Sequence, residues 1–128
     1  MMIYEVYNNN DLVEFLSNHL KKVLSDQEIG DKDLNDPEQL AEFIDSDFYC
    51  DGINHEQIGM KDYGLIERAG DGQLCYNVYS VTDGGRELKF AVSYYYSSWD
   101  SNTYRGVHLV SEQVVTKTVY EIVQWKRF

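Results

Sequence analysis

The period of the hydrophobic pattern changes once along the chain, close to residue 60, and this change limits the fold more than any other feature. Between residues 11 and 25 apolar residues recur every three or four positions, which is typical of a helix with one buried face. From residue 61 onward apolar and polar residues alternate, which is typical of strands. We therefore expect a helical half, residues 1–60, and a strand half, residues 61–128.

Capping residues mark three helix starts in the first half. Asp11 and Glu14 have the spacing of a capping box and predict that the first helix begins at about residue 11. Asp36 stands before a proline, a favoured first helical residue, and a glutamine three positions later completes a second box. Asn54 repeats the pattern before a segment long enough for a single turn. Two helices and one short turn are predicted.

Asp-Gly turns at residues 69–73 and 82–86 divide the second half into strands. The segments with strand periodicity after the first turn are residues 74–81, 88–96, 106–110 and 113–125. Segments joined by such turns pair in an antiparallel way, and an amphipathic helix covers the apolar face of a sheet. The sequence predicts an α+β fold, in which two N-terminal helices pack on a four- to five-stranded antiparallel sheet. One domain over residues 1–128 accommodates all of it.

The excess of acidic over basic residues is confined to the helical half. Residues 1–60 contain 14 acidic and 3 basic residues, a net charge of −11, whereas residues 61–128 contain 8 of each. Within residues 26–56 there are 11 acidic residues and one lysine. Such a surface repels phosphate, so we expect no direct binding of nucleic acid through it.

Targeting and disulfide signals are missing from the sequence. The N-terminal segment has neither a basic nor an apolar region of a secretory leader, and no apolar run approaches the roughly 20 residues of a membrane span. Cys50 and Cys75 are too few and too far apart for a disulfide framework. We expect a cytoplasmic protein with free thiols and no membrane partner, in the bacterial host cytoplasm if the protein is viral.

Two patterns resemble metal sites but are incomplete. Asp47, Asp51 and Gly52 match three positions of a calcium loop, while the position of the bidentate ligand is occupied by an isoleucine. Cys50, His55 and Cys75 lack the paired spacing of a zinc site and a fourth ligand. The sequence predicts no metal and no cofactor.

Catalytic patterns are no stronger. Asp71 or Asp83 followed by Glu87 and Lys89 has the residue order of a metal-dependent nuclease, but about one acid-x-Lys triplet is expected by chance in this composition. Ser97 or Ser98 with Asp100 and His108 supplies the three types of a hydrolase triad without a nucleophile elbow. We expect a protein that is not an enzyme.

An aromatic segment at residues 92–110 is the other unusual feature. Alternation sends Tyr95 to the face opposite Tyr94, and Trp99 and Tyr104 flank a polar tip. The rings of Tyr95, Trp99 and Tyr104 are therefore expected to project as interface anchors. The alternative is that the rings pack across the strands as part of the core. A stacking platform for single-stranded nucleic acid would need a basic groove, which Arg105 and Lys89 alone do not make.

The segment YYYSSWDSNTYRG followed by a strand ending VVTKTVYEIVQW resembles the small acidic accessory proteins of tailed bacteriophages. Members of that class with known roles mostly bind a bacterial protein, as anti-CRISPR proteins, anti-restriction DNA mimics and host-takeover factors do. The resemblance implies an inhibitor that occludes the nucleic-acid-binding site of a host defence complex. The partner-binding residues that we predict are Asp36, Glu38, Glu42, Asp45, Asp47, Asp51, Tyr95, Trp99, Asp100 and Tyr104.

Three functions are therefore open at this point. The first is the anti-CRISPR-like inhibitor that uses both the acidic helices and the aromatic hairpin, which is the aromatic segment at residues 92–110 read as two strands joined by its polar tip. The second is an interaction or assembly module that makes its contact through the hairpin alone. The third is a metal-dependent nuclease that uses Glu87 and Lys89. The sequence does not indicate an oligomeric state.

Overall fold

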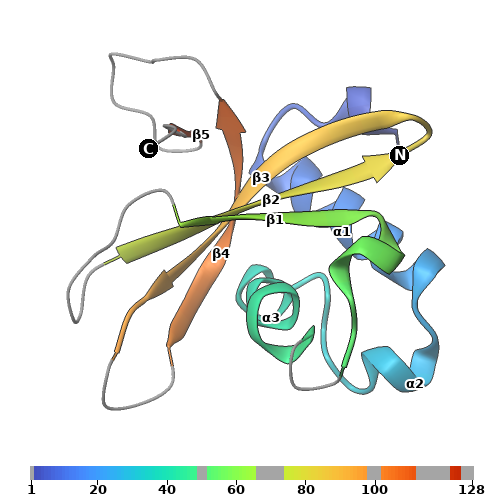
Figure 1. Ribbon diagram of the computed structural model, residues 1–128, viewed down its shortest axis with the longest axis horizontal. Helices are drawn as coiled ribbons and strands as arrows, with labels where there is room; N and C mark the ends of the chain where they lie inside the picture. Colours follow the sequence, from blue (N-terminus) through green and yellow to red (C-terminus); the bar gives the residue numbers. More distant parts are fainter. Residues whose placement is uncertain (1, 49–51, 66–73, 98–101, 112–121, 125–128) are drawn as a thin grey trace.

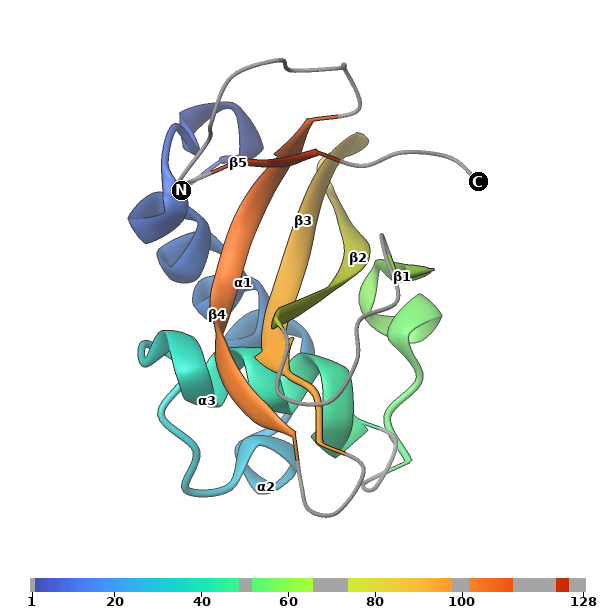
Figure 2. The ribbon, with the colours of Figure 1, turned by 90° about the vertical axis from the view of Figure 1, so that its left-hand side faces the viewer.

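The fold is a layer of helices on one face of a five-stranded sheet (Figure 1). The computed structural model describes residues 2–48, 52–65, 74–97, 102–111 and 122–124. In the perpendicular view the helices lie behind the sheet, so its other face carries no helix of the described chain (Figure 2). The predicted α+β class, with N-terminal helices packed on a largely antiparallel sheet, is confirmed.

Among the described residues, the helical layer consists of three α-helices, two 3-10 turns and one π-helical turn. In chain order these are η1 (Ile3–Glu5), α1 (Asn9–Val23), α2 (Asp26–Ile29), α3 (Pro37–Glu42), the π-helical turn η2 (Phe43–Asp47) and η3 (His55–Ile58).

Local capping sets the starts of these helices. Asp36 Oδ1 accepts a hydrogen bond from Glu38 N at 3.2 Å, and Asn54 Oδ1 accepts one from Glu56 N at 2.9 Å, so both predicted caps are confirmed. The prediction for α1 was wrong by a few residues. Its cap is Asn8, whose side chain accepts from Asp11 N at 2.8 Å, and Asp11 lies inside the first turn. The short helix α2 was not predicted, although Ser25 and Glu28 form a complete capping box.

The sheet has the order β1-β2-β3-β4-β5. Its strands are β1 (Met60–Leu65), β2 (Leu74–Asp83), β3 (Arg86–Tyr95), β4 (Thr103–Ser111) and β5 (Ile122–Gln124). Strands β1 to β4 pair in an antiparallel way, as predicted.

The prediction that all strands are antiparallel was wrong for β5, which pairs with β4 in a parallel way, with Leu109 opposite Ile122. An antiparallel partner for β4 would need a tight turn just after it, and the residues that follow β4 contain no Gly, Asn or Asp turn signal. A parallel pair instead requires a longer connection. Of the long strand predicted over residues 113–125, the structure describes only Ile122–Gln124, and residues 113–121 and 125 lie outside the described residues.

The core lies between the helical layer and the inner face of the sheet. Its fully buried side chains include Leu12, Leu16, Leu20, Leu40, Phe43, Ile44, Phe48, Tyr79, Phe90 and Val92. Each side chain of this size stabilises the fold by roughly 1.5–3 kcal/mol relative to exposure. The core therefore fixes the position of α3 and η2 against the strands.

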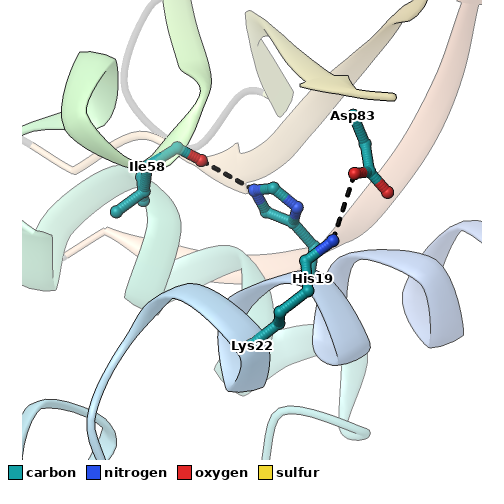
Figure 3. A network of polar contacts seen from close by, with 4 residues as sticks. All are labelled: His19, Lys22, Ile58 and Asp83. Atoms are coloured by element: carbon teal, nitrogen blue, oxygen red, sulfur yellow. Dashed lines mark hydrogen bonds and ion pairs between the residues drawn. The ribbon is translucent and has the colours of Figure 1, made fainter. Parts of the chain in front are cut away.

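Polar contacts attach the C-terminal part of α1 to the same layer. Figure 3 shows the buried His19, whose Nε2 lies 2.7 Å from the carbonyl oxygen of Ile58, and Lys22, whose Nζ lies 3.1 Å from Asp83 Oδ1. A carbonyl oxygen only accepts, so Nε2 of His19 carries the hydrogen. The two contacts connect α1 to η3 and to the end of β2.

Candidate functional site

Six carboxylates of α2, α3 and the loop between them are exposed, and we call them the acidic surface. They are Asp26, Glu28, Asp31, Asp33, Glu38 and Glu42. Capping explains part of the arrangement, since acids in the first turn of a helix interact favourably with its free amides. Hydrogen bonds from the backbone and side chain of Ser25 lower the pKa of Glu28, which favours its ionised form.

Few cations offset this charge. Within residues 26–48, Lys32 Nζ forms an ion pair with Asp47 Oδ2 at 3.6 Å. Lys32 also lies over the ring of Phe43, with its Nζ 5.0 Å from the centroid. The predicted site residue Asp47 is therefore half-buried and paired, while Glu38 and Glu42 point into solvent.

Asp45, which the sequence predicted to be a partner-binding residue, is instead hydrogen-bonded to side chains of the sheet. Its Oδ1 accepts hydrogen bonds from Tyr79 Oη at 2.5 Å and Asn77 Nδ2 at 2.6 Å, and its Oδ2 accepts one from Tyr104 Oη at 2.5 Å. We call these four residues the Asp45 cluster. In an ideal α-helix Asp45 would share a face with Glu42, but the wider π-helical turn η2 changes the rotation per residue. The carboxylate consequently faces the sheet.

The prediction that Tyr104 projects from the surface was also wrong, because Tyr104 is a core residue with 8 % of its surface exposed. Its ring centroid lies 5.5 Å from that of Tyr94. Burial, together with the hydrogen bond to Asp45, raises the pKa of Tyr104 well above its usual range. Burial raises the pKa of Tyr94 to about 12, with a further contribution from the Asp45 charge.

A β-bulge explains why Tyr104 faces inward. Ser93 pairs with Gly106 and Tyr94 pairs with Tyr104, so Arg105 is an extra residue on β4. Without the bulge, Tyr104 would lie on the same face of the sheet as Ser93, which is the face away from Tyr94 and the core. Because of the extra residue, Tyr104 lies on the inner face beside Tyr94.

Tyr95 is on the surface, as predicted. It is 37 % exposed, and Leu74, its partner on β2, is 38 % exposed. The guanidinium carbon of Arg105 lies 5.4 Å from the centre of the Tyr95 ring. Leu74 was not among the predicted site residues, because the alternation of β2 alone does not show that Leu74 is opposite Tyr95. Three predicted site residues, Asp51, Trp99 and Asp100, lie outside the described residues.

The residues of the predicted nuclease site form polar contacts with neighbouring side chains. Glu87 Oε2 accepts hydrogen bonds at 3.3 Å from Tyr63 Oη and from Ser80 Oγ, and Lys89 Nζ lies 4.0 Å from Glu87 Oε1. Asp83 is paired with Lys22, and Asp71 lies outside the described residues. The part of the chain that the structure describes contains no group of three or more His, Cys, Asp or Glu side chains that could hold a metal ion.

His55 and Cys75, two of the candidate zinc ligands, are both buried. His55 Nε2 lies 2.9 Å from Ile44 O, so the ring donates to a backbone carbonyl, and the ring stacks on Tyr79 with centroids 5.3 Å apart. Cys75 is a buried residue of β2. Cys50 lies outside the described residues.

A serine–histidine contact exists, but with a different serine from those that the sequence suggested. His108 Nε2 lies 2.7 Å from Ser93 Oγ, and His108 Nδ1 lies 3.4 Å from Asn9 Nδ2. Asn9 Oδ1 accepts from Leu109 N at 3.0 Å, which identifies the amide nitrogen as the group that faces the ring. No spacing rule could have found this contact, because it depends on the register of β3 and β4.

The hydrogen-bond directions give the state of this histidine. Asn9 donates to Nδ1, so the hydrogen of the neutral ring is on Nε2 and is donated to Ser93 Oγ. The Ser93 hydroxyl, 3.3 Å from Gly106 O, donates to that carbonyl. His108 thus has no free nitrogen to accept the serine proton, which is the opposite of the arrangement in a nucleophilic pair.

The chain matches no protein-family model, no curated protein and no solved structure at a significant level. Among the helices of the described residues, none is both long enough and apolar enough to cross a membrane.

Proposed function

We propose that the protein is a non-catalytic binding protein whose acidic surface docks against the basic, nucleic-acid-binding surface of another protein. In this role it excludes nucleic acid from that surface by competition. The resemblance of the C-terminal segments to phage accessory proteins suggests a bacterial host defence complex as the partner, in the manner of anti-CRISPR proteins. Such a role requires neither a metal nor a cofactor.

One observation carries the proposal: α2, α3 and the loop between them hold six exposed carboxylates, while Lys32 is the one basic residue in residues 26–48. Like charges at this density destabilise the isolated protein, because Glu38 and Glu42 stand four residues apart on α3 and repel by a few tenths of a kcal/mol. A partner rich in Lys and Arg would relieve that repulsion on binding. Carboxylates held on helices would then occupy the places of phosphates.

The Asp45 cluster supports the proposal indirectly. It ties η2, which directly follows α3, to β2 and β4 through the three hydrogen bonds of one carboxylate. Helix α3 also packs closely on β4, where a Cβ at Gly106 would lie 3.5 Å from Pro37 Cβ. Charges on a fixed helix bind a complementary surface with less loss of conformational entropy than charges on a mobile segment.

The test is an affinity capture from bacterial lysate with two matched double variants. Glu38→Gln/Glu42→Gln removes two charges of the acidic surface, and Glu14→Gln/Glu56→Gln removes two exposed charges of α1 and η3. We expect wild type and the Glu14/Glu56 variant to retain the same protein. The Glu38/Glu42 variant should lose it, and short duplex DNA or raised salt should release it from wild type, because screening weakens exposed charge pairs.

Two results would refute the proposal. One is equal retention by the two double variants, which would show that the acidic surface makes no contact. The other is a captured protein that duplex DNA fails to displace, which would show that the site is not shared with nucleic acid. Equal melting temperatures of the variants are the control for intact folding.

The second candidate, an interaction module that acts through the hairpin, is favoured by the exposed pair Leu74 and Tyr95. Aromatic and arginine side chains dominate the binding energy of protein interfaces, and Arg105 adjoins this pair. Tyr95→Ala should then abolish capture, while Glu38→Gln/Glu42→Gln leaves it unchanged. The two candidates therefore give opposite results in one experiment.

A further inference from the structure

The hydrogen-bonded chain Asn9–His108–Ser93 connects the first turn of α1 to the sheet, and we call it the His108 junction. It joins residues 99 positions apart, since Asn9 contacts the ring of His108 and accepts from the next amide, Leu109 N, at 3.0 Å. Leu109 is also the residue at which β5 pairs with β4, opposite Ile122. The junction thus holds together α1, β3 and β4 next to the edge strand.

Protonation of His108 is incompatible with this arrangement. The imidazolium carries hydrogens on both nitrogens, so Nδ1 would direct an N–H at the amide nitrogen of Asn9, which is itself a donor. Rotating the Asn9 amide by half a turn would satisfy Nδ1, but the amide nitrogen would then face Leu109 N, again donor against donor. One of the two contacts of Asn9 must therefore break when the ring gains a proton.

We propose that the His108 junction is an acid-sensitive latch, which fastens the start of α1 to β4 while His108 is neutral and releases it when His108 is protonated. On protonation one proton is taken up at Nδ1, the Asn9 amide turns so that its oxygen accepts from Nδ1, and the hydrogen bond from Leu109 N to Asn9 Oδ1 is given up.

The surroundings of His108 provide no counter-charge within the described residues. From β2, Tyr76 places its ring against the imidazole with centroids 5.8 Å apart, and burial raises the pKa of that phenol, which keeps it neutral. The side chains that β3 and α1 direct at the ring are Ser93 and Asn9, both uncharged. Asp11, the nearest acid along α1, accepts from Tyr7 N at 3.0 Å.

The direction of the effect follows from burial. Burial lowers the pKa of His108 below its ordinary value, since a buried imidazolium loses its hydration. The open state, in which the ring is hydrated, keeps the ordinary value of about 6.5. The latch is therefore fully closed above that pH and weakens as the pH falls below it, because the open state binds the additional proton.

The test is hydrogen exchange of the Leu109 amide in the full chain, measured by NMR from about pH 7 to about pH 5. Protection is expressed relative to the intrinsic exchange rate at each pH. In wild type we expect protection to fall below pH 6.5 by up to about tenfold per pH unit, the limit for uptake of one proton.

Two variants isolate His108 from the other two histidines. His108→Gln cannot titrate, so the pH dependence at Leu109 should disappear. Asn9→Asp keeps an acceptor for Leu109 N and offers a carboxylate oxygen to a protonated Nδ1, so the fall should disappear there too. Constant protection in wild type, or the same fall in Asn9→Asp, would overturn the proposal, and Asn9→Asp decides the matter even if His108→Gln does not fold.

Discussion

Replacing Asp45 with alanine tests whether this acid belongs to the fold or to the acidic surface. In the structure its carboxylate is the common acceptor for Tyr79, Tyr104 and Asn77, at 2.5, 2.5 and 2.6 Å. Tyr79 is fully buried and Tyr104 is 8 % exposed, so neither hydroxyl can turn to water without movement of the ring. Asp45→Ala therefore leaves two buried phenolic hydroxyls without this acceptor.

The magnitude follows from these two hydroxyls. A buried donor that loses its partner costs about 1–3 kcal/mol, so for two hydroxyls the free energy of unfolding should fall by about 2–6 kcal/mol. For a chain of this length 1 kcal/mol corresponds to about 4 °C in melting temperature, which gives an expected decrease of about 8–24 °C. Glu42→Ala is the matched control, because Glu42 is exposed in the preceding turn and its loss should change stability by less than about 0.5 kcal/mol.

The assay is thermal and urea unfolding of the two alanine variants, followed by circular dichroism without any partner. A double-mutant cycle of Asp45→Ala with Tyr104→Phe then measures the contact itself, with an expected coupling of roughly 0.5–3 kcal/mol. Equal stability of Asp45→Ala and Glu42→Ala would refute the reasoning, since it would mean that Asp45 is one more surface acid.

Two further predictions concern titration and backbone geometry. The folded-state pKa of Tyr94 is raised to about 12 and that of Tyr104 is raised further, so the unfolded chain loses these protons first. The free energy of unfolding should therefore be full below about pH 10 and decline above it, which urea unfolding across that range measures. A free energy of unfolding that stays constant to about pH 12 would contradict this. Gly59→Ala should destabilise the protein by about 1–3 kcal/mol, because Gly59 has φ +77° and its new Cβ would lie 3.0 Å from Thr82 O. Gly84→Ala, at φ +59° with open space around it, should cost less, and equal melting temperatures of the two variants would show that the contact with Thr82 is unimportant.

Features that depend on a few neighbouring residues could be predicted from the sequence. Asp36 and Asn54 cap helices through amides only two residues away, so the chain predicts these starts without knowledge of the rest of the fold. The change of hydrophobic period likewise predicted the α+β class, because burial of one face imposes a period of 3.6 on helices and of two on strands. The segregation of acids in the helical half is a property of the sequence alone.

Contacts between side chains far apart in sequence depend on how the helices and strands pack, and in three places the fold departs from the local pattern. The bulge at Arg105 turned Tyr104 inward, the π-helical turn η2 turned Asp45 toward it, and the parallel pairing of β5 replaced the expected hairpin. One extra residue in a strand or a turn reverses the face of a side chain, while the local pattern around it hardly changes. The choice is made by contacts between residues far apart in sequence, such as Asp45 with Tyr104 and Asn9 with His108, whose stabilisation exists only once the sheet has its final register.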